Sequence, residues 1–168
     1  MHQIDSNPSE NQLKLYHLLV SRKHYVSIAE SCTGGMVSSK IINVPGASNI
    51  IMESFITYSN ESKIKRLGVS AEILNSFGAV SKECVMEMAI NLQKLTHCDL
   101  SISVSGIAGP VGGTTDKPIG TVWFGYWYQN RVFIESHFFT GDRFSIRDQA
   151  SDFAIEKAIE ILESHPID

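Results

Sequence analysis

Residues 24–43 read HYVSIAESCTGGMVSSKIIN, and this stretch decides the class of the fold. Its first seven residues are typical of a short strand, and the polar turn SCTGG follows without a break. Beyond the two glycines, Val37 and Ile41 lie four residues apart, which is the spacing of one face of a helix. A strand that passes through a glycine turn into a helix indicates an α/β protein.

The segments around this stretch continue the mixture of helices and strands. Apolar periodicity predicts further helices at residues 9–23, 70–78, 81–97 and 145–162. Runs of β-branched and aromatic residues predict strands at 54–59 and 99–106, and an antiparallel hairpin within 121–141 that turns at Gln129 and Asn130. The sequence therefore predicts an α/β fold, a single-domain three-layer α/β/α sandwich with a mixed β-sheet, formed by residues 10–165 after a frayed N-terminal lead of residues 1–9.

The composition argues against several classes of protein. The chain has 168 residues and a net charge of −4, and it lacks the clustered basic surface that a binder of duplex nucleic acid needs. No window of about 18 apolar residues could span a membrane, and the first residues, MHQIDSNPSENQ, do not resemble a secretory signal. Three cysteines without a C-x-x-C pair and six scattered histidines indicate a cytoplasmic protein without a metal site.

Three loops are rich in glycine, serine and threonine, and the first is the SCTGG turn. Its backbone N–H groups and the positive end of the following helix would suit a phosphate or a carboxylate. No G-K-[ST] follows the glycines, so this is not a Walker A loop. Cys32 is either an activated thiol or a small apolar residue. The candidate binding residues of this loop are Ser31, Thr33, Gly34 and Gly35.

The second loop, SGIAGPVGG, begins where a predicted strand ends. Its glycine-lined backbone could supply N–H donors for an oxyanion or a phosphate. Its candidate residues are Ser105, Gly106, Gly109, Gly112 and Gly113. Further along the chain, Arg143 and Arg147 lie four residues apart where the last helix begins. They form either a cationic clamp for a phosphate or an ordinary solvated helix start.

The third loop, VPGAS, ends in Ser48, and Tyr58 and Lys63 follow within 15 residues. A serine nucleophile needs a base within hydrogen-bond reach, and no histidine lies in any of the three loops. A lysine can serve as that base when burial lowers its pKa. A return of the chain after the intervening strand could bring Lys63 to Ser48, whereas spacing alone favours a solvated Lys63.

Five motifs together resemble the CinA C-terminal domain family, the nicotinamide-nucleotide amidases. They are SIAESCTGG, VPGASNIIMESFITYSNESKIKRLGV, FGAVSKE, VSGIAGPVGGTTDKPIGTVWF and FTGDRFSIRDQA, and they occur in the order of that family. The resemblance covers residues 10–162. It implies an enzyme that hydrolyses the carboxamide of nicotinamide mononucleotide to nicotinate mononucleotide and ammonia.

The resemblance also implies the roles of three residues. Ser48 of VPGAS would be the nucleophile, Lys63 the base and Tyr58 its helper, with neither metal nor cofactor. It further implies a homodimer and a stand-alone amidase domain, because this chain has no room for the additional N-terminal domain of many family members. The candidates for holding the substrate phosphate are Ser31, Thr33, Gly34 and Gly35, the loop through Gly112 and Gly113, and Arg143 or Arg147, and the sequence does not choose among them.

Two departures from the family pattern leave other functions open. Ala47 stands where the family often has serine or glycine, and Ser54 stands where it usually has glycine. Ser54 could reshape the wall of the site and change the substrate to another small phosphorylated amide. A third hypothesis is a nucleotide-binding or regulatory module that binds without turnover.

Overall fold

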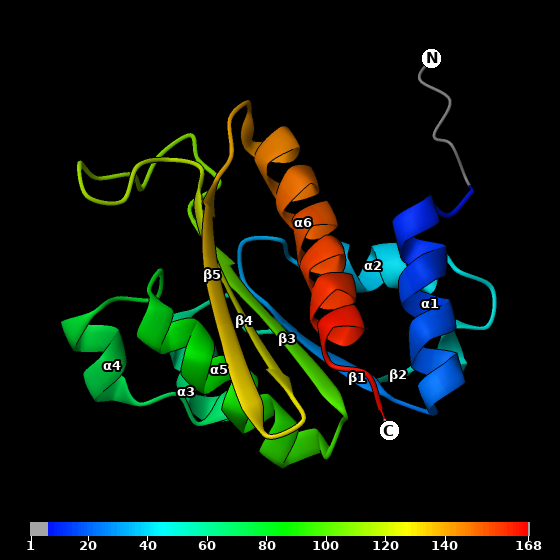
Figure 1. Cartoon of the computed structure of the whole chain (residues 1–168). Coiled ribbons are helices and arrows are strands. Elements are labelled where there is room, and N and C mark those ends of the chain that lie inside the picture. Colours follow the sequence, from blue (N-terminus) through cyan, green and yellow to red (C-terminus); the bar gives the residue numbers. More distant parts are fainter. Residues whose placement is uncertain (1–6, 168) are drawn as a thin grey trace.

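A computed structural model describes residues 7–167, and these residues form one mixed β-sheet between two layers of helices (Figure 1). The sheet has the strand order β2-β1-β3-β4-β5. β2, β1 and β3 are parallel, whereas β4 runs antiparallel to both β3 and β5. The strands are β1 (Val26–Glu30), β2 (Ile51–Ile56), β3 (Leu100–Gly106), β4 (Thr121–Tyr128) and β5 (Arg131–Phe138).

The helices divide between the two faces of the sheet (Figure 1). One layer contains α1 (Glu10–Arg22), α2 (Met36–Ile42) and α6 (Arg143–Ser164). The other contains α3 (Asn60–Leu67), α4 (Ala71–Ser76) and α5 (Lys82–Thr96), and a short 3-10 turn, η1 (Ala47–Asn49), precedes β2. Alternate strand residues supply the two cores, as Ile28 packs beneath the first layer and Ala29 beneath the second. The predicted three-layer α/β/α sandwich with a mixed sheet is confirmed.

Local signals in the sequence explain where several elements begin and turn. Ser9 caps α1 through a capping box with Gln12, so the helix begins at the predicted boundary. Ser81 caps α5 by accepting from the Cys84 N–H. Gln129 and Asn130 have φ of 49° and 58°, as the predicted tight hairpin turn requires. Residues 1–6 of the predicted N-terminal lead lie outside the described residues.

The structure differs from the sequence prediction around β2 and α3. The second strand begins at Ile51 rather than at residue 54, and α3 was not predicted. The sequence of α3, NESKIKRL, lacks an apolar stripe because a lysine takes part in its inward face. Lys63 and Leu67, four residues apart, are the buried positions of this helix. Helix prediction depends on the periodicity of apolar residues, and a lysine is not counted among them even when it is buried.

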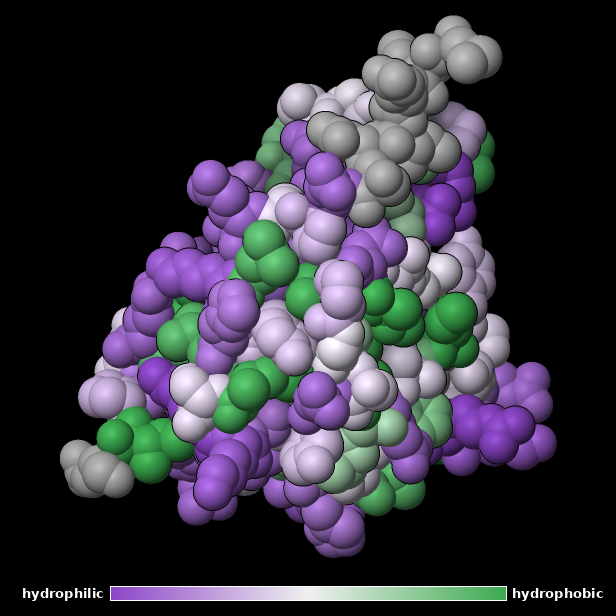
Figure 2. All heavy atoms as spheres, turned by 90° about the vertical axis from the view of Figure 1, so that its right-hand side faces the viewer, coloured by the Kyte–Doolittle hydropathy of each residue, from purple (hydrophilic) through white to green (hydrophobic). Residues whose placement is uncertain are grey.

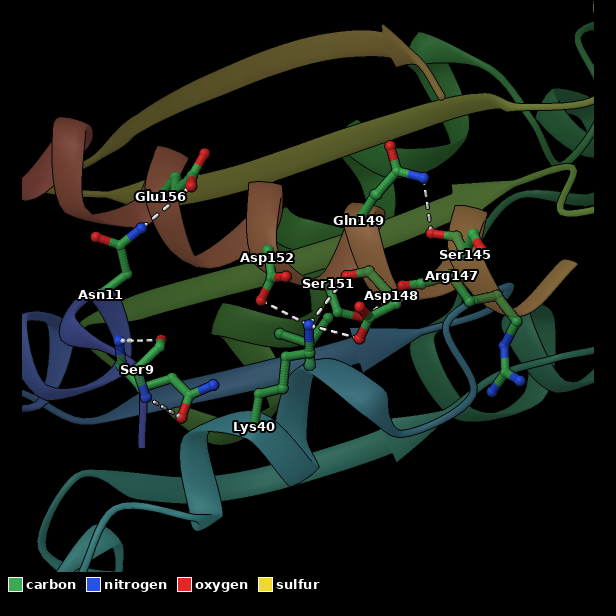
Figure 3. Close-up of polar contacts among 12 residues, drawn as sticks. Ser9, Asn11, Lys40, Ser145, Arg147, Asp148, Gln149, Ser151, Asp152 and Glu156 are labelled. Carbon is green, nitrogen blue, oxygen red and sulfur yellow. Dashed lines mark hydrogen bonds and ion pairs between the residues drawn. The ribbon is translucent and has the colours of Figure 1, made fainter. Parts of the chain in front are cut away.

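Ion pairs fix α2 against α6. Lys40 reaches from α2 to two acidic residues of α6, with Nζ 2.8 Å from Asp148 Oδ1 and 2.6 Å from Asp152 Oδ1 (Figure 3). The Lys40 side chain is only 15% exposed, which limits screening of these pairs by solvent. This contact matters for the site because α2 follows the SCTGG turn and α6 carries Arg143 and Arg147.

The outer surface of the α1 and α2 layer is mixed in polarity. Figure 2 shows apolar patches among polar side chains on this side of the molecule, and Leu13, Val20 and Ile42 are exposed. No helix among the described residues combines the length and the apolar character needed to cross a bilayer. Single exposed apolar residues are normal on a protein surface, so the predicted homodimer stays a prediction.

Candidate active site

Lys63 is the buried centre of the site. α3 places this side chain beneath the carboxyl ends of the strands, where none of it is exposed to solvent. Its Nζ lies 2.8 Å from the Thr57 carbonyl oxygen, 3.2 Å from the Tyr58 carbonyl oxygen and 3.0 Å from Ser31 Oγ. Burial lowers the pKa of Lys63, because the ammonium group loses its hydration.

The three partners of Lys63 determine which hydrogen bonds its neutral amine makes. A neutral amine has two N–H donors and one lone pair, and a carbonyl oxygen can only accept. The two N–H groups therefore go to the carbonyls of Thr57 and Tyr58. The lone pair is left for Ser31, whose hydroxyl then donates to Nζ. This is the arrangement of a serine nucleophile with a lysine general base.

Ser31 is held at the end of β1, a central strand of the sheet. Its side chain is 7% exposed, and its N–H donates to the Val104 carbonyl of the neighbouring β3. The residue before it, Glu30, is fully buried. Ser31 thus occupies a rigid position at the junction of β1 and the SCTGG turn.

Glu30 binds the N-terminus of α2. Its carboxylate accepts from the N–H groups of Gly35, Val37 and Ser38 at 2.9, 3.1 and 2.9 Å, and from Ser38 Oγ at 2.6 Å. Ser54 contacts the Ser38 hydroxyl, so its side chain joins this network rather than the wall of the site. The prediction that the start of α2 is open to a phosphate is wrong, because the carboxylate of Glu30 takes these donors and complements the helix dipole.

A cavity of about 210 Å³ opens above Ser31 and Lys63. It lies where β1, β2 and β3 end, the usual position of ligand sites in α/β sheets. The lining residues are Ser31, Cys32, Tyr58, Lys63, Ala79, Val80, Ser105, Gly106, Ala108 and Arg143. Loops far apart in the sequence therefore meet at one small cavity.

Arg143 and Tyr58 meet at the wall of this cavity. Arg143 Nη2 donates to the Tyr58 hydroxyl at 3.1 Å, and Nη1 donates to the Gly109 carbonyl at 2.6 Å. The Tyr58 side chain is 59% exposed, which places it toward solvent rather than in the buried Ser31/Lys63 pair. Arg143 is thus the predicted cation that reaches the cavity.

Arg147 binds the backbone of the SCTGG turn. Its side chain extends from α6 away from Lys40 (Figure 3) and donates to the Cys32 carbonyl at 3.0 Å and the Thr33 carbonyl at 2.9 Å. Two of the five N–H donors of its guanidinium therefore bind successive carbonyls of the SCTGG turn. The predicted role of Arg147 as a phosphate clamp stays a prediction.

The structure does not bring Ser48 to Lys63, so the predicted nucleophile is corrected. Ser48 lies exposed in η1, before β2 begins, whereas Tyr58 and Lys63 follow after β2 ends. β2 is parallel to β1 and six residues long, and at roughly 3.3 Å per residue it separates the two ends by about 20 Å. The chain does not return, and Ser31 takes the position beside Lys63.

The remaining predicted binding residues divide between the cavity and its surroundings. Ser105 and Gly106 line the cavity, and Gly109 contributes the carbonyl that Arg143 binds. Gly112 and Gly113 are exposed and are not lining residues. The members of the SCTGG turn other than Ser31 shape the turn: Thr33 is buried, Gly34 lies against Arg147, and Gly35 donates to Glu30.

Cys32 is not an activated thiol. Burial raises its pKa to about 12, and the nearby Lys63 and Arg147 offset this only in part. The thiolate is the reactive form, so Cys32 acts as a small apolar residue of the cavity wall. Within residues 7–167, no group of three or more His, Cys, Asp and Glu side chains has the arrangement of a metal site.

Sequence reasoning missed Glu30 and assigned Ser31 only to binding. One signal was available for Glu30: a carboxylate at a strand end, five residues before the glycine that opens a helix, is well placed to cap that helix. The pairing of Ser31 with Lys63 had no local signal, because 32 residues separate them.

The fold and the site together define the class of protein: a single-domain α/β protein with a buried serine and lysine pair at the ends of parallel strands. The family model for the CinA C-terminal domain matches residues 9–162. The chain therefore belongs to the CinA C-terminal domain family.

Curated relatives agree with this assignment. A CinA-like protein from Petrotoga mobilis is 45% identical over 151 residues, covering 90% of this chain and 38% of that relative. A CinA-like protein from Kosmotoga olearia is 49% identical over 131 residues, covering 78% of this chain and 32% of the relative. The chain thus spans about a third of the length of these relatives.

Solved structures share the fold over nearly their whole length. A CinA superfamily protein from Klebsiella pneumoniae matches with a TM-score of 0.90 and 33% identity, covering 95% of this chain and 99% of that one. A competence/damage inducible protein from Agrobacterium tumefaciens matches with a TM-score of 0.86 and 30% identity, covering 97% and 99%.

Proposed function

We propose that this protein is a nicotinamide-nucleotide amidase in which Ser31 is the nucleophile and Lys63 the general base. The observation that carries the proposal is the position of Lys63 Nζ, 3.0 Å from Ser31 Oγ and bound on its other sides by two carbonyls that can only accept. A hydrolase with this pair needs no histidine. The nature of the substrate rests on the resemblance to nicotinamide-nucleotide amidases.

The reaction has two halves. Neutral Lys63 takes the Ser31 proton as Oγ attacks the carboxamide carbon of the substrate, and a tetrahedral oxyanion forms. The resulting ammonium of Lys63 gives its proton to the leaving nitrogen, and ammonia departs from an acyl-enzyme. Water then attacks the acyl-enzyme with Lys63 again as base, and nicotinate mononucleotide leaves as Ser31 recovers its proton.

The cavity supports a substrate of which only one end is buried. Its volume of about 210 Å³ is below the roughly 300–1,000 Å³ of pockets that enclose a whole ligand. The ring and carboxamide would enter the cavity, and the ribose phosphate would extend toward Arg143, whose guanidinium suits a phosphate. Tyr58 contacts both the base and the proposed phosphate site, since its carbonyl binds Lys63 and its hydroxyl binds Arg143. The pyridinium charge would further favour neutral Lys63.

Ammonia release from nicotinamide mononucleotide tests the proposal. We expect release by the parent protein, loss of it in Ser31→Ala, and unchanged release in Ser48→Ala, all measured in the presence of a chelator. Loss in Ser48→Ala with retention in Ser31→Ala would overturn the assignment of the nucleophile. A folded parent that releases no ammonia would overturn the substrate.

Ammonia release and nucleotide binding together distinguish two other functions. Ammonia from another small phosphorylated amide, and none from nicotinamide mononucleotide, would indicate a related amidase. Tight binding of the nucleotide without ammonia release would indicate a regulatory module. The buried Ser31/Lys63 pair favours turnover over binding alone. Burial of a lysine lowers the stability of the fold, and binding of a nucleotide does not require a buried lysine.

A further inference from the structure

The first three residues of the turn after β1 have hydrogen-bonded carbonyl oxygens. The Ser31 carbonyl accepts from the Gly34 N–H at 3.1 Å. The Cys32 carbonyl accepts from Arg147 Nε at 3.0 Å, and the Thr33 carbonyl accepts from Arg147 Nη2 at 2.9 Å. Three successive peptide planes are therefore fixed, two of them by a single side chain of α6.

The direction of each carbonyl fixes the direction of the N–H in the same peptide. In a planar trans peptide the C=O and the N–H point opposite ways. The bound carbonyls of Ser31 and Cys32 therefore turn the N–H groups of Cys32 and Thr33 away from their partners. Among residues 7–167, no other residue accepts from either N–H, and the Cys32 N–H contacts only the thiol of its own side chain. Cys32 lines the cavity beside Ser31.

We propose that the N–H groups of Cys32 and Thr33 stabilise the oxyanion formed on attack by Ser31, and that Arg147 is the residue that positions them. This inference rests on the proposed serine and lysine chemistry. Two adjacent N–H groups next to a nucleophile are the usual form of an oxyanion hole. Arg147 touches no reacting atom and acts only through the backbone of the turn.

Gly34 and the choice of arginine fit this role. Gly34 has φ of +59°, and a Cβ there would lie 3.2 Å from Arg147 Nη2. A glycine therefore lets the guanidinium reach the turn. The planar fork of arginine offers Nε and Nη2 to two successive carbonyls at once, and the point charge of lysine cannot reproduce this geometry.

The test compares two arginines of α6 that lie one turn apart. Loss of one oxyanion donor typically lowers kcat by about 10²–10³-fold. We expect Arg147→Ala to lower kcat for ammonia release by about 100-fold and to change KM by less than about threefold. Arg143→Ala, the matched variant, should instead mainly raise KM, because Arg143 lies where the substrate phosphate is proposed to bind.

Two further measurements separate positioning from a merely structural role. Added guanidinium should restore part of the kcat of Arg147→Ala, and Arg147→Lys, which keeps the charge and most of the volume, should fold normally and still lose most of its kcat. Normal kcat in either variant would overturn the inference. So would a loss of kcat that guanidinium does not restore and that parallels a fall in the melting temperature.

A fluorophosphonate probe makes the test independent of the substrate. Its reaction with Ser31 also develops charge on an oxygen, and mass spectrometry measures its rate on the labelled serine. We expect labelling to slow by about 100-fold in both Arg147 variants and by less than about threefold in Arg131→Ala, which changes an exposed arginine at the start of β5. If the parent labels at Ser31 yet releases no ammonia from nicotinamide mononucleotide, the substrate is wrong while this inference stands. Equal labelling rates in parent and Arg147 variants would overturn it.

Discussion

The turn of residues 31–35 and the turn of residues 45–48 contain similar residues but perform different tasks. Each combines glycine with positive φ and a serine next to a short helix. The first follows the end of β1 and joins Ser31 to Lys63, whereas the second precedes β2 and leaves Ser48 exposed. The end of the strand that the turn adjoins, rather than the composition of the turn, decides which serine reaches the cavity. The predictions below test this difference.

The largest expected effect is on catalysis by Lys63. Lys63→Met should lower kcat by at least about 10³-fold, because removal of one member of a catalytic pair eliminates most of its contribution. Lys65→Met, which changes an exposed lysine two residues further along α3, should alter kcat less than twofold. Steady-state ammonia release measures both, and comparable loss in the two variants would contradict the pairing of Lys63 with Ser31.

The second effect is on the stability of the first turn. Glu30→Gln should lower the free energy of unfolding by about 3 kcal/mol, because a buried carboxylate that satisfies the start of α2 is lost. Glu53→Gln, at an exposed position of β2, should change it by less than about 0.5 kcal/mol. Urea unfolding followed by circular dichroism gives both values, and a similar small change in the two variants would show that Glu30 does not hold the turn.

The third effect is the dependence of activity on pH. Burial lowers the folded-state pKa of Lys63 below its ordinary value of 10.5, and only the neutral amine is the base. Below the folded-state pKa, kcat/KM for ammonia release should rise about tenfold per pH unit, and it should level off above that pKa. A value of kcat/KM that does not change with pH below the folded-state pKa would contradict a lysine base.

Stability should depend on the same titration. Between the lowered pKa and 10.5, the unfolded chain holds a proton on Lys63 that the folded chain does not. The free energy of unfolding therefore gains up to about 1.4 kcal/mol per pH unit as the pH rises through this window. Lys63→Met should lack this rise, which urea titrations at several pH values would reveal. Identical pH dependence in parent and variant would place the Lys63 pKa at its ordinary value.

The smallest effect compares the two glycine turns directly. Gly34 and Gly46 have φ of +59° and +89°, so alanine should cost about 1–2 kcal/mol of stability at either position. Only Gly34→Ala should also lower kcat, because its Cβ would press on Arg147. Thermal unfolding and ammonia release on the same samples separate the two effects, and a loss of kcat in Gly46→Ala would reopen a role for residues 45–48.

Much of the fold could be predicted from the sequence because its signals are local. The strand and helix of residues 24–43, the serine caps and the turn at Gln129 and Asn130 each depend on residues a few positions apart. The α/β class and the family follow from these patterns and from five motifs. In the site, the resemblance singled out Lys63, and the place at a strand end singled out Ser105 and Gly106; all three line the cavity.

The tertiary structure alone decided how these pieces combine. The sequence by itself determined most of the elements, though not α3, and the types of residue available for catalysis, since both depend on local geometry and side-chain chemistry. It could not determine that Lys63 meets Ser31 rather than Ser48, that Glu30 occupies the start of α2, or that Arg147 binds the backbone. These contacts join positions 32 and 114 residues apart, or depend on which end of a strand a turn occupies. Only the packing of parallel strands and their helices brings such groups within hydrogen-bond distance.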